Sequence, residues 1–137
     1  MSAITRQRTG FSLPRYLVTV AIAAAVNVAL YFIGAAVGAA MSVTMSGGQD
    51  IGWPEASIAT VVPLALAGVV AWLITRRWPK PLPYFRVIGL VVAVASVAAP
   101  VFTAVDPLSA IVLAAMHVVA GLAWFLGTRP VGSATRP

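Results

Sequence analysis

Two polar side chains interrupt long apolar stretches of the sequence, and these residues are the best placed to do chemistry. His117 is the one histidine of the chain, and Asn27 lies within the first apolar stretch. His117 comes eleven positions after Asp106, and Asn27 comes eleven positions after Tyr16. Because a helix rises about 1.5 Å per residue, each would lie roughly 16 Å from its end of a membrane helix, near the bilayer centre. We therefore expect both side chains at one level.

The chemistry of these two residues has three interpretations. An amide or imidazole in hydrocarbon needs a hydrogen-bond partner, so the first is a structural bond from His117 to Asn27 or to the backbone. Ser96, or a carbonyl freed by Pro63 or Pro100, would serve equally well as a partner. The second is a proton-handling or ligand-binding histidine, because ionisable groups inside membranes often mark pathways. The third is a histidine that faces a partner protein.

The sequence offers few other reactive groups. The absence of cysteine excludes disulfides, thiolate nucleophiles and cysteine-based metal centres, and a single histidine excludes a histidine-rich metal site. Asp106 and Glu55 are expected at helix starts away from His117, and Asp106 followed by Pro107 is typical of an N-cap. No recognisable nucleophile–base motif accompanies them. We therefore expect a protein that is not an enzyme, with no catalytic, cofactor-binding or metal-binding residue.

Composition places these residues in a membrane protein. The chain has 137 residues, of which 61% are hydrophobic and 9% are charged, whereas soluble domains carry about 25% charged residues. Its apolar runs are long enough to cross a bilayer, which takes roughly 20 residues. The sequence thus predicts an all-α bundle of four transmembrane helices, near residues 16–45, 55–76, 84–105 and 107–127. The expected organisation is a basic tail over 1–14, a transmembrane domain over 15–127 and a second tail over 128–137.

Charge sets the expected orientation. The nine Lys and Arg residues fall on one side of the predicted topology and the three acids fall on the other. Because short loops rich in Lys and Arg stay in the cytoplasm, we expect both termini there, in the cell inner (plasma) membrane, and no nucleic-acid partner. Residues expected at the lipid headgroups are Arg15, Arg76, Arg77, Lys80, Arg86 and Arg129. Tyr16, Trp78, Tyr84 and Trp124 are expected in the inner aromatic belt, with Trp53 and Phe102 near the outer one.

Small residues indicate where the helices pack. Gly34 and Gly38 form a Gly-x-x-x-Gly pattern in the first predicted helix, a spacing that lets membrane helices approach closely. Gly68 and Gly121 lie in similar segments near the ends of the second and fourth helices. This similarity predicts either an internal duplication of two hairpins or only the small residues and aromatic ends that membrane hairpins share.

The order of these features is similar to that of one protein family. The features are Pro14-Arg15-Tyr16 at the start of the first helix, Asn27 within it, Trp53-Pro54 in the first loop, and Met116-His117 followed by Ala120-Gly121 in the last helix. In these features the chain resembles a family of small actinobacterial four-helix membrane proteins catalogued only as a domain of unknown function. The resemblance implies the four-helix fold and supplies no activity.

Three classes of function compete. The first is an accessory or scaffolding subunit of a larger envelope membrane complex, of lipid-transport or respiratory type. The second is a small oligomeric transporter or channel that uses His117 and Asn27 near the membrane midplane, although proton-driven exporters usually need an intramembrane carboxylate. The third is a lipid enzyme, which the missing nucleophile–base cluster disfavours. The expected partners are membrane lipids and other membrane subunits or further copies of the chain.

The topology can be tested by labelling, because the natural sequence has no cysteine. We expect that Gln49→Cys reacts with a membrane-impermeant maleimide on intact cells, since it lies in a loop on the acidic side. The control Lys80→Cys, in the basic loop, should react only after the membrane is permeabilised. The reverse pattern would overturn the orientation.

Overall fold

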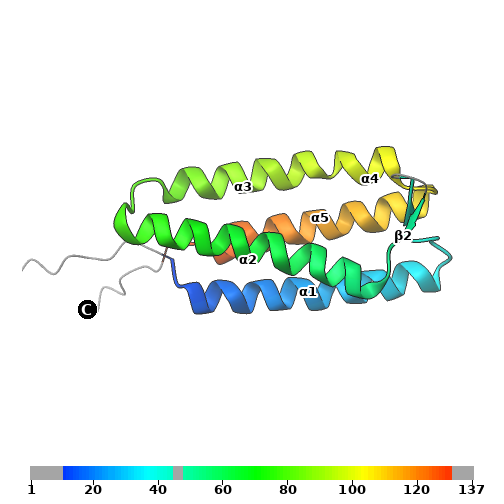
Figure 1. The fold of residues 1–137 in the computed structure, drawn as a ribbon, viewed down its shortest axis with the longest axis horizontal. Helices are drawn as coiled ribbons and strands as arrows, with labels where there is room; N and C mark the ends of the chain where they lie inside the picture. Colours follow the sequence, from blue (N-terminus) through cyan, green and yellow to red (C-terminus); the bar gives the residue numbers. More distant parts are fainter. Residues whose placement is uncertain (1–10, 45–47, 131–137) are drawn as a thin grey trace, which may run out of the picture.

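The structure is a computed structural model that describes residues 11–44 and 48–130 of the chain. Apolar helical spans lie side by side along the length of the molecule (Figure 1). They are α1 (Leu13–Ala36), α2 (Trp53–Arg77), α3 (Leu82–Ser96) continued by α4 (Ala98–Thr103), and α5 (Pro107–Gly127). Among the described residues, four spans are long and apolar enough to cross a membrane, with α3 and α4 forming one of them. The predicted all-α four-span bundle is therefore confirmed. Arg6, Arg8, Arg136 and most of both expected tails lie outside the described residues.

The four spans begin in the same way. A proline stands in the first turn of each, where its missing N–H costs no hydrogen bond. These prolines are Pro14, Pro54, Pro83 and Pro107. At the start of α5, the Asp106 carboxylate also accepts a 2.8 Å hydrogen bond from the backbone N–H of Ser109, so the predicted N-cap is confirmed.

The first helix is shorter than its apolar run predicts. It ends at Ala36 rather than near residue 45, because Gly38 adopts a φ of 95°. The N–H of Ala39 bonds to the carbonyl of Gly34 at 2.9 Å, and the N–H of Gly38 bonds to that of Ala35 at 3.1 Å. This pair of bonds is a Schellman motif, in which glycine takes the left-handed position after the helix. The expectation that Gly38 packs on a helical face is wrong, since the pattern is instead a helix stop.

A small hairpin follows this stop. β1 (Ser42–Val43) and β2 (Gln49–Asp50) pair antiparallel, where the sequence predicted the end of the first helix and then a loop. The backbone after α4 joins them, since the N–H of Val105 bonds to Ser42 and the N–H of Thr44 bonds to Thr103. The third span consequently ends at Thr103 and not at residue 105 as predicted. The hairpin covers the end of the bundle opposite the start of α1 and the end of α5 (Figure 1).

The third span is interrupted at Val97, which separates α3 from α4. Pro100 lies four residues after Ser96, so its ring displaces the Ser96 carbonyl and its missing N–H leaves that carbonyl without its helical partner. Pro63, which stands inside α2, leaves that helix unbroken over residues 53–77. The two prolines inside the spans thus differ in effect.

The start of α5 holds the segment after α1 in place. The Ser109 hydroxyl donates to the Asp106 carboxylate and accepts from the N–H of Met41 at 2.8 Å. Asp106 also accepts from the N–H of Ala40 at 3.2 Å. The hydrogen bonds from the side chain and then the backbone of Ser109 hold the pKa of Asp106 below its usual range. One cap residue therefore fixes both the helix start and the neighbouring loop.

α5 is the central element of the bundle. It packs along α1 on one side and along α3 and α4 on the other, while α2 packs along α1 and makes few contacts with α3. Gly34 lies against Val112 of α5, and Gly121 lies against Ala93 of α3. The end of the bundle that carries Arg76, Arg77 and Lys80 is called the basic half below, and the end that carries Asp50, Glu55 and Asp106 is called the acidic half. Side chains fill the interior of the basic half, whereas the acidic half contains a cavity.

The basic half of the bundle is closed around Tyr16. This side chain is fully buried, packs edge-on against Phe11 and Trp124, and donates a 2.7 Å hydrogen bond to the carbonyl of Leu64 in α2. Its ring lies against Gly68, which leaves it room. Trp124 is buried too, whereas Trp78 and Tyr84 are exposed. Two residues predicted for the lipid-facing belt, Tyr16 and Trp124, therefore belong to the core, because glycines on neighbouring helices admit their rings.

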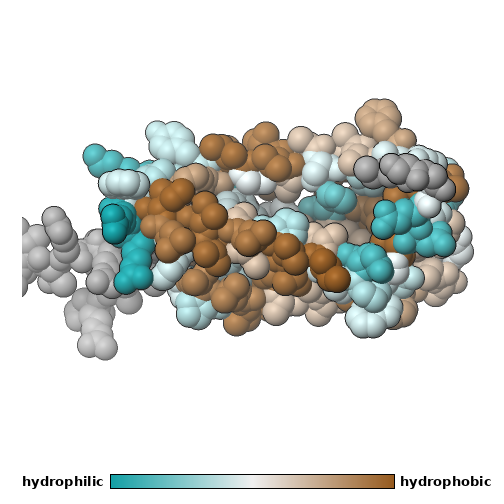
Figure 2. All heavy atoms as spheres, in the orientation of Figure 1, coloured by the Kyte–Doolittle hydropathy of each residue, from teal (hydrophilic) through white to brown (hydrophobic). Residues whose placement is uncertain are grey.

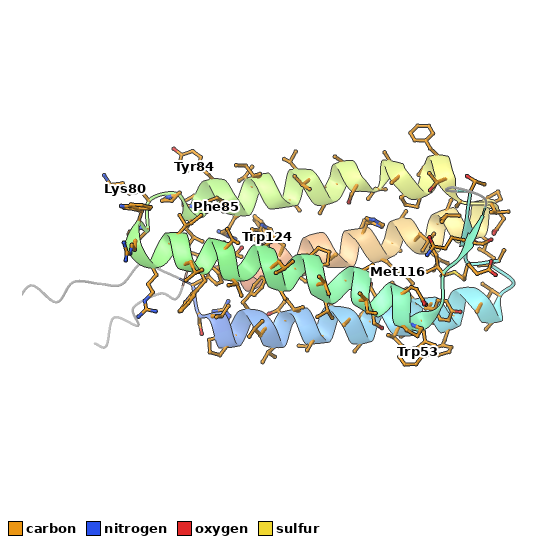
Figure 3. The ribbon with its side chains drawn as sticks, viewed as in Figure 1. Trp53, Lys80, Tyr84, Phe85, Met116 and Trp124 are labelled. Carbon is orange, nitrogen blue, oxygen red and sulfur yellow. The ribbon has the colours of Figure 1, made fainter. Side chains whose placement is uncertain are left out.

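A reciprocal pair of bonds joins α3 to α5 at the same end. Trp124 Nε1 of α5 donates to the carbonyl of Phe85 in α3 at 3.0 Å. In the opposite direction, the guanidinium of Arg86 in α3 donates to the carbonyl of Phe125 in α5 at 3.2 Å. The Arg86 guanidinium also lies 4.4 Å from the centre of the Phe125 ring. Figure 3 shows Phe85 and Trp124 near this end. The sequence predicted that Arg86 faces the lipid headgroups. Its guanidinium instead contacts Phe125 of α5.

The surface has the polarity of a membrane-spanning bundle. Hydrophobic side chains cover the middle of the face shown in Figure 2, and hydrophilic ones gather at its two ends. At one end stand the exposed bases Arg15, Arg76, Arg77, Lys80 and Arg129, and Arg76 also stacks over Trp72 at 5.2 Å. Asp50, Glu55 and Asp106 belong to the opposite end. Bases and acids among the described residues are therefore separated along the bundle axis.

Packing at Gly68 can be tested by adding a side chain. Gly68→Val should lower stability by about 1–3 kcal/mol, because any Cβ there overlaps the Tyr16 ring and the core around it is full. Ala67→Val, one residue away on an exposed position, is the matched control. Thermal unfolding in detergent measures both. Equal melting temperatures for the two variants would contradict the tight contact.

Candidate functional site

A cavity of about 320 Å³ lies in the acidic half of the bundle. It is bounded by α2 and α4, by α1 and α5, and at its end by the hairpin (Figure 1). Figure 2 shows the surface hollowed between α2 and the third span, with hydrophilic atoms inside the hollow. Small side chains line much of it, which explains why the helices leave it open: Ala56, Ala59, Ala99, Pro100 and Ala120.

Asn27 forms the polar floor of this cavity. It is 1% exposed, and its Nδ2 donates to Thr60 Oγ1 at 2.8 Å and to the carbonyl of Met116 at 3.3 Å. Thr60 in turn donates to the carbonyl of Ala56 at 2.8 Å. The asparagine lies on the buried face of α1 that also carries Tyr16, since the two are eleven residues apart, about three turns. One side chain thereby ties α1 to both α2 and α5.

The other end of the amide has no partner. Asn27 Oδ1 is buried and accepts no hydrogen bond among the described residues. The orientation of the amide is set by chemistry, because the Met116 carbonyl only accepts and must face the NH₂ group. A buried acceptor without a donor costs folding free energy, because it has lost its hydrogen bonds to water and gained none in return. The cavity therefore has one unsatisfied acceptor at its floor.

His117 lines the same cavity but does not bond to Asn27. Its Nδ1 lies 2.7 Å from the carbonyl of Leu113, one turn earlier in its own helix. Since a carbonyl only accepts, Nδ1 carries the proton in this contact, and Nε2 of the neutral ring is left as an acceptor. Of the structural partners expected for His117, the backbone is the one observed, and it comes from α5 itself.

The predicted site residues are brought together only in part. Asn27 and His117 share one level, because Asn27 bonds to the carbonyl of Met116, the residue before His117. Ser96 does not join them, since its hydroxyl bonds to Ala93 in its own helix at 2.7 Å. Sequence reasoning missed Thr60, whose signal was a hydroxyl within the apolar second run. It also missed Ser109, three positions after the N-cap.

The polar groups of the site can donate and accept hydrogen bonds. Among residues 11–44 and 48–130, no cluster of three or more His, Asp, Glu or Cys side chains could hold a metal ion. The polar groups facing the cavity are an amide, an imidazole, hydroxyls and, at the hairpin end, Gln49 and Glu55. Asn27, Thr60 and His117 bond to one another or to backbone carbonyls, in no nucleophile–base arrangement.

Fold and site together define a small multi-pass membrane protein with a polar-floored cavity inside its bundle. The chain belongs to a family of unknown function (DUF6069), whose family model matches residues 7–133. This match confirms the predicted resemblance to a family catalogued only as a domain of unknown function. No match was found among curated proteins or among solved structures.

The tie from Asn27 to α2 can be tested with two buried threonines of that helix. Thr60→Val should lower stability by about 0.6–1.7 kcal/mol, because it removes a hydrogen bond between helices inside the membrane. Thr75→Val is the matched control, since the Thr75 hydroxyl bonds only to carbonyls of its own helix. Denaturant unfolding in mixed micelles measures both. A loss at Thr75 equal to that at Thr60 would contradict the role given to Asn27.

Proposed function

We propose that this protein is a non-catalytic accessory subunit of a larger envelope membrane complex, and that it holds a lipid-like molecule there. The observation that carries the proposal is the cavity between α2 and α4, with its polar floor and small apolar walls. Its volume of about 320 Å³ falls at the lower end of ligand pockets. Such a cavity in a membrane bundle is reached from the surrounding lipid, which favours an amphiphile over a water-soluble solute.

The third span supports the accessory role. Only 6% of its most apolar window is buried within the chain, against 22–33% for the other three spans. It packs chiefly on α5 and leaves most of its circumference free, with Val87, Val91 and Val94 among its exposed residues. A partner transmembrane helix would find its largest free surface there. We propose the plasma membrane as its location, with both termini cytoplasmic, on the basis of the segregated charges.

A small transporter or channel is the second candidate, because Asn27 and His117 line one cavity. Against it stands the packed basic half, where Tyr16, Phe11 and Trp124 leave no polar continuation from the cavity floor. A transporter would need that cluster to open. The accessory role requires no such rearrangement.

Purification in a gentle detergent distinguishes the two candidates. An accessory subunit should be recovered with a foreign membrane subunit in fixed stoichiometry. Val91→Trp on the third span should reduce that recovery several-fold, while Ile22→Trp, equally exposed on α1, should leave it unchanged. Recovery as a homo-oligomer alone would favour the transporter and contradict the proposal, as would equal recovery of both variants.

A further inference from the structure

The buried floor of the cavity is made of hydrogen-bond acceptors. Asn27 lines the cavity with a side chain that is 1% exposed, and its Oδ1 has no donor among the described residues. The Asn27 NH₂ group is already used by Thr60 and Met116, and the Thr60 hydroxyl is used by Ala56. The free nitrogen of His117, Nε2, is also an acceptor in the neutral ring. The floor therefore lacks a donor.

We propose that the cavity binds the neutral hydroxyl head of an amphiphilic lipid, which donates to Asn27 Oδ1 and to His117 Nε2. The proposal rests on the lipid-holding role above and names the class of molecule held. A hydroxyl head supplies the missing donor, and two hydroxyls would reach both acceptors. The acyl chain would leave between α2 and α4, past the small side chains of Ala59 and Ala99, which line that side.

The charges around the cavity exclude the other common head groups. No Lys or Arg is among its lining residues, so a phosphate or carboxylate head at the floor would meet hydrogen-bond acceptors and no cation. An ammonium head would meet acceptors, but Glu55 is exposed at the start of α2, about one turn before Thr60, and not at the floor. A cation at Asn27 would therefore lack a counter-charge in low dielectric. The neutral hydroxyl costs least.

The apolar part of the ligand fits the walls. Apart from the polar floor and the hairpin end, the lining consists of Val, Ile, Leu, Met, Ala and Pro side chains. Other residues of α2 and the third span are apolar and exposed, such as Ile58 and Val101. A chain leaving the cavity would continue along a surface that already faces lipid.

Binding of four single-chain probes to the purified full-length protein in phosphatidylcholine nanodiscs tests the proposal. The probes are monooleoylglycerol with hydroxyl donors, methyl oleate without a donor, oleylamine and oleate. We expect monooleoylglycerol to bind about tenfold tighter than methyl oleate, the gain of one satisfied buried hydrogen bond. Oleylamine and oleate should bind no better than methyl oleate. Titration followed by thermal shift and by native mass spectrometry measures the affinities.

Two variants locate the binding. Ala99→Phe fills the cavity and should abolish the preference for monooleoylglycerol, whereas Ala98→Phe, exposed on the same helix outside the lining, should retain it. Equal affinity for monooleoylglycerol and methyl oleate, a preference for oleylamine or oleate, or no binding of any probe would each overturn the proposal. The comparison of probes on the natural protein stands even if Ala99→Phe does not fold. The accessory role is tested by recovery of a partner subunit, an experiment that uses no added lipid. A failure of the probe experiment would therefore contradict the ligand class and leave the accessory role standing.

Discussion

In hydrocarbon a polar group can bond only to protein, and the packing of this bundle depends on that constraint. In the basic half the Tyr16 hydroxyl reaches Leu64 and the Trp124 indole reaches Phe85, while Arg86 reaches Phe125 through a terminal nitrogen and leaves its buried Nε without a partner. Buried Thr75 and Thr128 bond to carbonyls one turn back in their own helices. In the acidic half the same constraint is met on one side of the Asn27 amide and left unmet on the other. The two halves differ in how completely side chains fill them.

The two halves differ because of what stands opposite the small residues. At the basic end, glycines at 68, 89 and 127 face aromatic rings from α1 or α5, which fill the space that the glycines leave. At the acidic end, the small residues of α2 and α4 face one another across the bundle, and no large side chain enters between them. Pro100, which breaks the third span at Val97, lines this open side. Small residues thus produce close packing in one half and a cavity in the other.

The sequence predicts the spans well because lipid imposes length and hydrophobicity on them, and their proline starts are local signals. It predicts less well what depends on partners. Gly38 reads as a packing residue by spacing, but its role follows from a backbone φ of 95° that spacing does not encode. Tyr16 reads as an interfacial residue, but Gly68 on another helix admits its ring to the core. The level shared by Asn27 and His117 can be predicted by counting residues along each helix. Their separate hydrogen bonds depend on how each helix is rotated about its axis. The sequence does not predict that rotation, because apolar residues occur on all sides of these helices.

The placement of Asn27 has a consequence for how the chain is assembled. Its amide bonds to Thr60 of α2 and to the backbone of α5, which leaves the ribosome after the other three described spans. Gly34 of the same helix packs against Val112, which also belongs to α5. α1 is therefore synthesised before α5, its second neighbour. Until α5 is made, the Asn27 amide and the surface at Gly34 lack their contacts with that helix. Completion of the bundle is a post-insertion step, and the biogenesis machinery has to shelter α1 until the C-terminal helix arrives.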